Sequence, residues 1–338
     1  MVRDRDRVVG WWLLVATLLL FGMIVLGGVT RLTRSGLSIT TWDPITGVLP
    51  PLDDDAWRDA YARYQASPEG RLVATDLDLV GFRHIFLVEW SHRLLGRFIA
   101  VWTLIPFAYF AWKKRLPAGL VRRVAAVVAL GAAQGVLGWI MVASGLVDVP
   151  HVSPYRLTAH FLVGVLLFAA VEWSALDVLA PSRARIAAPR AVRATTAAVV
   201  ASVVAALGWG GLMAGHHAGL VFADFPTMGG SLNPLSGRAL TPTTFVADGM
   251  AVHFTHRLLA TIVAIAVVAL LVTTRSPAIS RRARNLAIVL VAVVALQITL
   301  GALTVLHHVP IVLASAHQAT AIALVAVAVA FVHDLIPE

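Results

Sequence analysis

Two similar segments, 164 positions apart, hold most of the residues that could do chemistry. The first reads Glu89-Trp-Ser-His92-Arg-Leu-Leu, and the second reads His253-Phe-Thr-His256-Arg-Leu-Leu. Residues three apart share a helix face, so Glu89 is expected beside His92, and His253 beside His256. Ionisable side chains inside an apolar membrane span are costly and are usually functional. These side chains are therefore the first candidates for a site.

The composition indicates the class of protein. Of 338 residues, 59% are hydrophobic and 13% are charged, and the mean hydropathy is +0.82. Apolar runs of about 20 residues recur, each long enough to cross a bilayer core of about 30 Å. The chain is therefore predicted to be an all-α polytopic membrane protein. It has no cysteine, which excludes disulfides, thiolate metal sites, iron–sulfur clusters and covalent c-type haem.

The apolar runs predict eight transmembrane helices, at 9–29, 83–112, 121–144, 156–179, 193–214, 250–273, 284–305 and 311–333. Sixteen lysines and arginines flank these runs on one side, against eight on the other. By the positive-inside rule, both termini are expected in the cytoplasm, in a multi-pass protein of the cell inner membrane. The positive-inside rule accounts for the net charge of +9, which therefore indicates no nucleic acid partner. The partner around the spans is expected to be membrane lipid.

The chain is internally repeated. The pair Gly27-Gly28 recurs at an offset of 183, and the spacing of Gln134 and Gly138 recurs at an offset of 163. An even number of spans in each half makes the repeat parallel, related by an axis along the membrane normal. The expected fold is thus two pseudo-symmetric four-helix bundles.

A stretch rich in proline and arginine near residue 181 separates the predicted halves, residues 1–180 and 181–338. Each half has one long outer loop, at about residues 30–82 and 215–249. Asp53 begins a candidate surface helix in the first loop as an N-cap residue. Long loops on one face often carry function.

Four histidines occupy matching places early in the even-numbered spans: His92, His160, His256 and His317. At about 1.5 Å per residue, all four lie within about 6–14 Å of the outer surface. Two imidazoles on facing helices can ligate one haem iron axially. The competing interpretation of each histidine is a hydrogen bond to a neighbouring helix, but four in two repeats favour haem iron ligands. The remaining outer histidines receive no role: His84, His151, His216, His217, His307 and His308.

Arginines accompany these histidines. Arg93 and Arg257 each follow a histidine, and a buried guanidinium needs an anionic partner such as a haem propionate. The alternative is that both side chains extend to the outer interface. Arg31 and Arg34 depart from the positive-inside pattern, which suggests contact with an anion; the alternative is solvation in the loop.

The two segments differ at one position, where the first has Glu89 and the second His253. A buried glutamate beside a ligand could accept a proton or stabilise a cationic intermediate. The alternative is a structural bond from Glu89 to an arginine or histidine. The divergence suggests that one half does chemistry and the other supports it.

With these residues, the chain resembles the haem A synthase family over nearly its whole length. The resemblance rests on the blocks GGVTRLTRSGLSITTWDPITGVLPPL, FRHIFLVEWSHRLLGR, FPTMGG, HFTHRLLA and ASAHQATA. It implies eight helices in two four-helix halves. It also implies an oxidoreductase that converts haem O to haem A for cytochrome oxidase, oxidising a porphyrin methyl to a formyl group through successive hydroxylations.

The resemblance also implies roles for single residues and partners. His256 and His317 would ligate a resident haem b, while His92 and His160 would face the substrate haem O and product haem A, with Glu89 next to the reacting site. Haem O synthase (protohaem farnesyltransferase) and cytochrome oxidase assembly are the implied partners, and a homo-oligomer is compatible with them. Some bacterial members carry a cysteine pair in the first outer loop. This chain lacks it and is similar to the cysteine-free alphaproteobacterial and mitochondrial members.

Two other functions compete with this one. A dihaem b-type electron-transfer cytochrome would stagger its histidines across the bilayer, whereas these four cluster on one side, and it would not need Glu89 in only one half. A transporter is suggested by the parallel repeat alone. It would leave the four histidines unexplained.

Overall fold

The computed structural model describes residues 4–43, 46–147, 150–180 and 188–336, and these residues form helices and loops without a named strand. Eight helices are long and apolar enough to cross a membrane. They are α1 (Asp4–Leu32), α4 (Leu79–Trp112), α5 (Ala118–Ala143), α6 (Pro154–Leu179), α7 (Arg190–Gly215), α9 (Gly249–Thr273), α10 (Arg281–Leu306) and α11 (Ile311–Leu335). The prediction of eight membrane-crossing helices is confirmed. The protein is an all-α multi-pass membrane protein.

Side-chain caps explain why several helices begin before the apolar runs do. Asp78 caps α4, its carboxylate accepting a hydrogen bond of 2.7 Å from the Gly81 N–H. Asp248 caps α9 in the same way. An N-terminal carboxylate satisfies a free N–H group and interacts favourably with the helix dipole. Asp53 is the N-cap of the surface helix α2 (Asp54–Gln65), as predicted.

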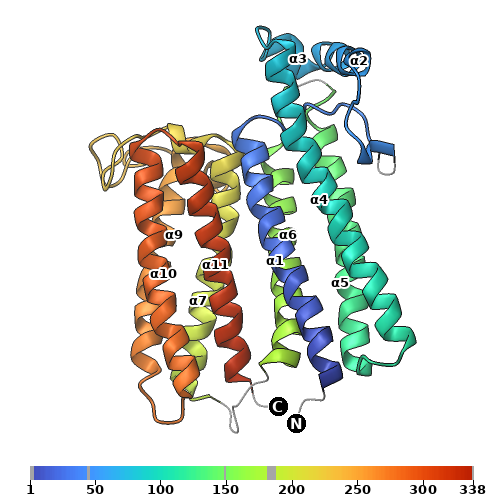
Figure 1. The fold of residues 1–338 in the computed structure, drawn as a ribbon. Helices are drawn as coiled ribbons and strands as arrows, with labels where there is room; N and C mark the ends of the chain where they lie inside the picture. The colour runs from blue at the N-terminus through green and yellow to red at the C-terminus, as the bar shows by residue number, and fades with distance from the viewer. Residues whose placement is uncertain (1–3, 44–45, 148–149, 181–187, 337–338) are drawn as a thin grey trace.

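The first four long helices lie on one side of the molecule and the last four on the other (Figure 1). Helix α6 packs against α7, and α11 packs against both α1 and α6, which joins the two groups. The predicted boundary at residue 181 borders residues 181–187, which lie outside the described residues. Both termini lie at one end (Figure 1), and we call the opposite end, which carries the two long loops, the loop end.

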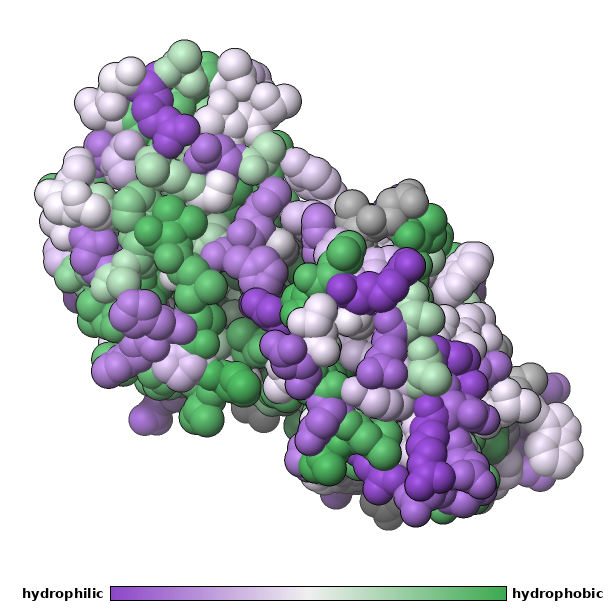
Figure 2. Space-filling view, turned by 90° about the horizontal axis from the view of Figure 1, so that it is seen from above, coloured by the Kyte–Doolittle hydropathy of each residue, from purple (hydrophilic) through white to green (hydrophobic). Residues whose placement is uncertain are grey.

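The loop end is built unequally over the two groups. The first loop forms α2 and the short helix α3 (Pro68–Leu72), which stand above α4 (Figure 1). The second loop contains the short helices η2 (Ala218–Leu220) and α8 (Thr244–Ala247). Viewed from above, hydrophilic side chains crowd this end, with apolar patches between them (Figure 2). This polar cover differs from the apolar flanks of the long helices.

Close backbone contacts hold the two helix groups together. A Cβ on Gly215 of α7 would lie 2.6 Å from the Cα of Pro154 in α6, so the two backbones touch there. Gln318 of α11 donates a hydrogen bond of 2.8 Å to the carbonyl of Ile24 in α1. Small residues permit such approaches in membranes, and interhelical hydrogen bonds strengthen them. The seam is therefore tightly packed near the loop end.

A polar network joins the helices at the end with the termini. His333 of α11 lies 2.9 Å from Asp177 of α6, which also pairs with Arg123 of α5. Asp334 accepts a hydrogen bond of 2.5 Å from Ser280 and pairs with Arg282 at 3.4 Å. The two helix groups are thus connected at both ends.

The absence of natural cysteine allows the orientation to be tested directly. We expect a cysteine introduced at Asp55, in the exposed first loop, to react with a membrane-impermeant maleimide in intact cells. A cysteine at the exposed Ala278, between α9 and α10, should react only after permeabilisation. The cysteine-free protein is the background control. The reverse pattern of labelling would contradict cytoplasmic termini.

Candidate functional site

His256 of α9 and His317 of α11 face each other across the second helix group. Their ring centres are 6.4 Å apart and the ring planes are inclined at 79°. Because imidazole–metal bonds are about 2.0–2.1 Å long, two imidazoles on opposite sides of one metal have centres roughly 6 Å apart. The pair has the spacing that axial ligation of one iron requires.

His92 of α4 and His160 of α6 form the corresponding pair in the first group. The two side chains are electrostatic neighbours. Gln134 of α5 donates a hydrogen bond of 2.8 Å to the His160 carbonyl and so ties α5 to α6 at this level. Both Nδ1 atoms are buried without a full hydrogen bond.

Glu89 lies within α4, almost fully buried at 2% exposure, and both its oxygens are occupied. Oε2 accepts hydrogen bonds of 2.8 Å from the Ser38 hydroxyl and from the Ile39 N–H. Oε1 accepts two from Arg93, at 3.0 Å from Nε and 2.6 Å from Nη2. The structural bond from Glu89 to an arginine, which the sequence analysis gave as the alternative interpretation, is observed. Its carboxylate also fixes the loop segment 38–39 against α4.

Arg93 completes this attachment of the loop. Its Nη1 donates to the Thr41 carbonyl at 2.9 Å, and its Nη2 donates to the Ile39 carbonyl at 3.0 Å. The guanidinium is therefore satisfied by Glu89 and by loop carbonyls. We call this arrangement, in which an arginine joins an α-helix to the outer loop, the arginine clamp.

The second group repeats the arginine clamp with one substitution. Arg257 donates from Nε to the His253 Nε2 at 3.0 Å, and from its two terminal nitrogens to the carbonyls of Thr227 and Asp224, each at 2.9 Å. His253 is 1% exposed and takes the place of Glu89. In both clamps the arginine Nε bonds to a side chain on its own helix and the two terminal nitrogens bond to loop carbonyls. Only the first clamp contains a carboxylate.

The clamped segment of the second loop is stabilised by Asp224. Its carboxylate accepts hydrogen bonds from the backbone N–H groups of Gly229 and Gly230 and from the Thr227 hydroxyl. These bonds, that from Gly229 foremost, lower the pKa of Asp224 from 3.8 to about 2. The side chain is therefore ionised throughout the neutral range. Gly229 and Gly230 adopt φ of 63° and 81°, which favours glycine.

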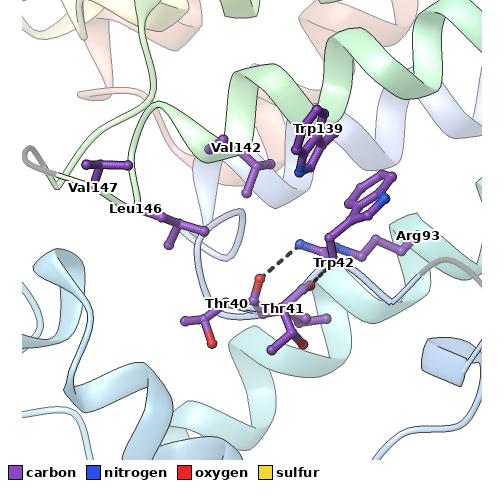
Figure 3. Close-up of a pocket in the computed structure, with 10 residues that line it drawn as sticks. Thr40, Thr41, Trp42, Arg93, Trp139, Val142, Leu146 and Val147 are labelled. Carbon is purple, nitrogen blue, oxygen red and sulfur yellow. Dashed lines mark hydrogen bonds between the residues drawn. The ribbon is translucent and has the colours of Figure 1, made fainter.

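A cleft opens beside the first clamp, between the loop segment 39–42 and the end of α5 (Figure 3). Its volume is about 190 Å³. Trp42 stands between Arg93, whose guanidinium lies 5.8 Å from the Trp42 ring centre, and Trp139, whose ring centre is 6.3 Å away. At the offset of 163, the second group has Ala302 in place of Trp139. The cleft wall is therefore particular to the first group.

The other candidate arginines and histidines have protein partners at the loop end. Arg31 donates to the Ala214 carbonyl and lies 3.0 Å from the His217 Nδ1, which links α1 to the end of α7. Arg34 has a positive φ of 54° and is exposed. The His216 ring lies 2.9 Å from the Val246 carbonyl. Burial beside Arg31 and Arg34 lowers the pKa of His217, which favours its neutral form.

Sequence reasoning missed the loop residues of the site. Ser38, Ile39 and Thr41 contact Glu89 or Arg93 through two backbone carbonyls, one backbone N–H and one hydroxyl. Backbone groups carry no residue-type signal, so only their place in the segment TRSGLSITTW could have indicated them. Trp42 in that motif was visible but had no assigned role.

The residues present fit a haem with two axial histidines in the second group. The 6.4 Å spacing of His256 and His317 matches two ligands of one metal, and the Nδ1 of His317 lies 3.1 Å from the Gln297 carbonyl. A ligating imidazole usually donates its second ring N–H to such an acceptor, which fixes the ring orientation. No cluster of three or more histidine, cysteine or carboxylate ligands occurs among the described residues, so a metal bound only by protein finds no support there.

The fold and the site define a multi-pass helical membrane protein with paired histidines near one end of its bundle. The protein-family model described as "Cytochrome oxidase assembly protein" (COX15-CtaA) matches residues 10–329. The chain belongs to this family.

Relatives in several bacteria match the chain over nearly its full length. A protein named "Heme A synthase" from Caulobacter sp. (strain K31) is 42% identical over 331 residues, which cover 97% of this chain and 96% of the relative. Another of that name, from Nitrosospira multiformis, is 42% identical over 96% of this chain and 92% of the relative. One from Bradyrhizobium diazoefficiens is 41% identical over 96% and 90%.

The two clamps make different predictions for stability. In Glu89→Gln, the amide NH2 group would face a hydrogen-bond donor of Arg93, Ser38 or Ile39, and the Arg93 charge would lose its anion. We therefore expect the free energy of unfolding to fall by about 3–5 kcal/mol. In the matched variant His253→Gln, the amide oxygen can still accept a hydrogen bond from Arg257. The free energy of unfolding should therefore fall by only about 1 kcal/mol. Unfolding of both variants in detergent measures the difference. Equal losses would show that the carboxylate charge does not hold the first loop.

Proposed function

We propose that this protein is a haem A synthase, an oxidoreductase that converts the methyl group of haem O to the formyl group of haem A through successive hydroxylations. The name shared by the full-length relatives supports this function. The observation that carries it is the placement of two histidine pairs in related helices, with a buried carboxylate beside only one of them.

In this proposal the second group, within residues 181–338, holds a resident haem b. His256 and His317 would be its axial ligands, and the haem would supply electron transfer when bound. The Gln297 carbonyl would orient the His317 ring through Nδ1, and the Gln297 side-chain nitrogen, 3.3 Å from the His317 Nε2, would move aside when Nε2 holds the iron. His253 and Arg257 hold the second loop in place above this site. The described hydrogen bonds of Arg257 go to the His253 ring and to two backbone carbonyls, which suits a supporting role.

The first group, within residues 1–180, would bind the substrate haem O between His92 and His160. Glu89 lies one helical turn from His92, where its carboxylate would accept a proton or stabilise positive charge at the reacting site. Its four hydrogen bonds fix the carboxylate in one orientation. A positioned general base typically contributes about 10²–10⁴-fold to a rate. Arg93 stabilises the ionised form of Glu89 and, by holding the loop, covers the site from water.

The cleft beside Arg93 is a second feature of the first group that suits a reacting site. It lies between the clamped loop and α5, lined by Trp42, Trp139 and the apolar end of α5 (Figure 3). A haem with a long apolar substituent needs such an apolar opening. Ala302 leaves the second group without the corresponding indole.

The cellular setting follows from the same proposal. The protein would lie in the cell inner membrane with both termini in the cytoplasm, so that both histidine pairs are in the outer leaflet. Haem O synthase would supply the substrate, and cytochrome oxidase would receive the product. A homo-oligomer is compatible with the exposed apolar flanks of α4 and α5, although these flanks equally suit lipid.

The alternative function is a dihaem b-type electron-transfer cytochrome. Two spectroscopically similar bis-histidine haems would be expected in that case. The Glu89 carboxylate in one half and the location of both pairs toward the loop end favour the synthase instead.

Haem extraction and chromatography of purified variants test the proposal. We expect haem B together with haem O or haem A in the wild-type protein. Glu89→Gln should retain haem B but shift the remainder toward haem O or its hydroxylated intermediate, with conversion lowered about 10²–10⁴-fold because the proton acceptor is lost. His256→Ala should lose haem B.

The matched control is Glu172→Gln, which makes the same substitution in α6 about twelve residues from His160 and should leave the haem composition unchanged. Retention of haem B by Glu89→Gln shows that the variant is folded. If every variant contains haem B alone, at two per chain, the synthase function is wrong and the electron-transfer cytochrome is supported.

A further inference from the structure

We propose that Gly27, Gly138, Gly210 and Gly301 are positioning residues, each of which seats one of the four site histidines against bare backbone. The inference rests on the proposed function, because it concerns the orientation of the haem-facing imidazoles. Each glycine belongs to the odd-numbered membrane span that precedes the histidine's helix.

The contact is the same in all four places. A Cβ built on each glycine would have a histidine ring carbon, Cε1, as its nearest neighbour. The distances to Cε1 are 3.1 Å from Gly27 to His92, 2.9 Å from Gly138 to His160, 3.4 Å from Gly210 to His256 and 2.9 Å from Gly301 to His317. In each pair Nδ1 is the next nearest ring atom. The imidazoles therefore meet the preceding helix through Cε1, with Nδ1 slightly closer than Nε2 at Gly27, Gly138 and Gly301.

In three of the four pairs, a backbone carbonyl of the glycine's helix interacts with the histidine. The Nδ1 of His317 is 3.1 Å from the carbonyl of Gln297, four residues before Gly301. The carbonyl of Ala206, four residues before Gly210, interacts with His256. The carbonyl of Gln134, four residues before Gly138, likewise interacts with His160. At these two, Nδ1 stops short of a full hydrogen bond.

Helix geometry connects the glycine to that carbonyl. In an α-helix the carbonyl of one residue accepts the N–H of the residue four positions later, so the two lie on one face. A side chain at the later position would cover the carbonyl from the neighbouring helix. Glycine leaves it open, and an acceptor for the second ring nitrogen fixes the orientation of a ligating imidazole.

The pattern is not a general property of glycines in these helices. A Cβ on Gly22 of α1, or on Gly131 or Gly135 of α5, would meet nothing within 4 Å. Gly208 of α7 would meet only Leu162, at 3.9 Å. Contact with a histidine ring is therefore particular to these four positions: a Cβ on the adjacent Gly28 or Gly211 would meet Gln318 or Thr158 instead.

In a glycine-to-alanine variant at these positions, the added methyl group would press on the histidine ring. How far the ring must move depends on the site. At Gly301 the methyl would lie 2.9 Å from His317, closer than such contacts occur, so the imidazole must turn or the helices must separate. At Gly210 the distance of 3.4 Å from His256 is an ordinary contact. The two ligands of one haem thus differ in their tolerance of alanine.

The test compares Gly301→Ala, Gly210→Ala and the control Gly208→Ala in the purified full-length protein. Low-spin bis-imidazole haem is followed by electron paramagnetic resonance, and haem retention and midpoint potential are followed by titration. We expect Gly301→Ala to lower haem b affinity by about 10- to 100-fold and to alter the low-spin signal and the potential. Gly210→Ala should have a smaller effect, and Gly208→Ala none.

In the first group, Gly138→Ala should weaken the binding of added haem to the His92–His160 pair. Its control, Gly135→Ala, should leave that binding unchanged. The variant His317→Ala establishes whether His317 is a ligand at all. If it leaves the low-spin signal of the second group intact, the proposed haem b site is wrong, and the positioning inference fails with it. If His317→Ala removes the signal but Gly301→Ala matches Gly208→Ala, only the positioning inference is overturned.

Discussion

Polar groups inside a membrane have no water to bind, so each must find a partner within the protein. This constraint organises the loop end of the molecule. Arg93 and Arg257, toward the loop end of α4 and α9, meet it by bonding to loop carbonyls and to a buried group on their own helix. Each arginine therefore fixes an irregular loop over a helix group. Without that attachment, neither loop would have a defined position above the histidines.

The two helix groups keep this arrangement but differ in charge. The first clamp ends in the carboxylate of Glu89, which receives four donors, whereas the second ends in the neutral acceptor of His253. A buried anion beside a cation can hold or release a proton at a fixed point, which a histidine already bonded to Arg257 does less readily. The first group also has the cleft walled by Trp42 and Trp139. Duplication followed by local divergence would give one reacting half and one supporting half.

Much of the fold could be predicted, because membrane crossing imposes length and apolarity on each helix. The eight spans and the Asp53 cap were predicted from hydropathy and residue type, while the earlier starts of α4 and α9 depend on Asp78 and Asp248. The histidines and Glu89 were found because charges in apolar runs are rare. The contacts of Arg93 and Arg257 differ from the propionate or interface contacts considered from sequence. Their partners are loop carbonyls, which no residue type reveals.

The sequence by itself determined the class of protein and the number of helices, and it indicated the four histidines proposed as haem iron ligands, because each depends on composition or on spacing along the chain. The tertiary structure decided which groups meet across helices. It placed the ring centres of His256 and His317 6.4 Å apart and gave both oxygens of Glu89 hydrogen-bond donors. It also brought four glycines into contact with the imidazoles. These contacts depend on how helices and loops distant in the chain approach one another. Such distances follow from packing and backbone geometry, which residue spacing within a helix does not fix.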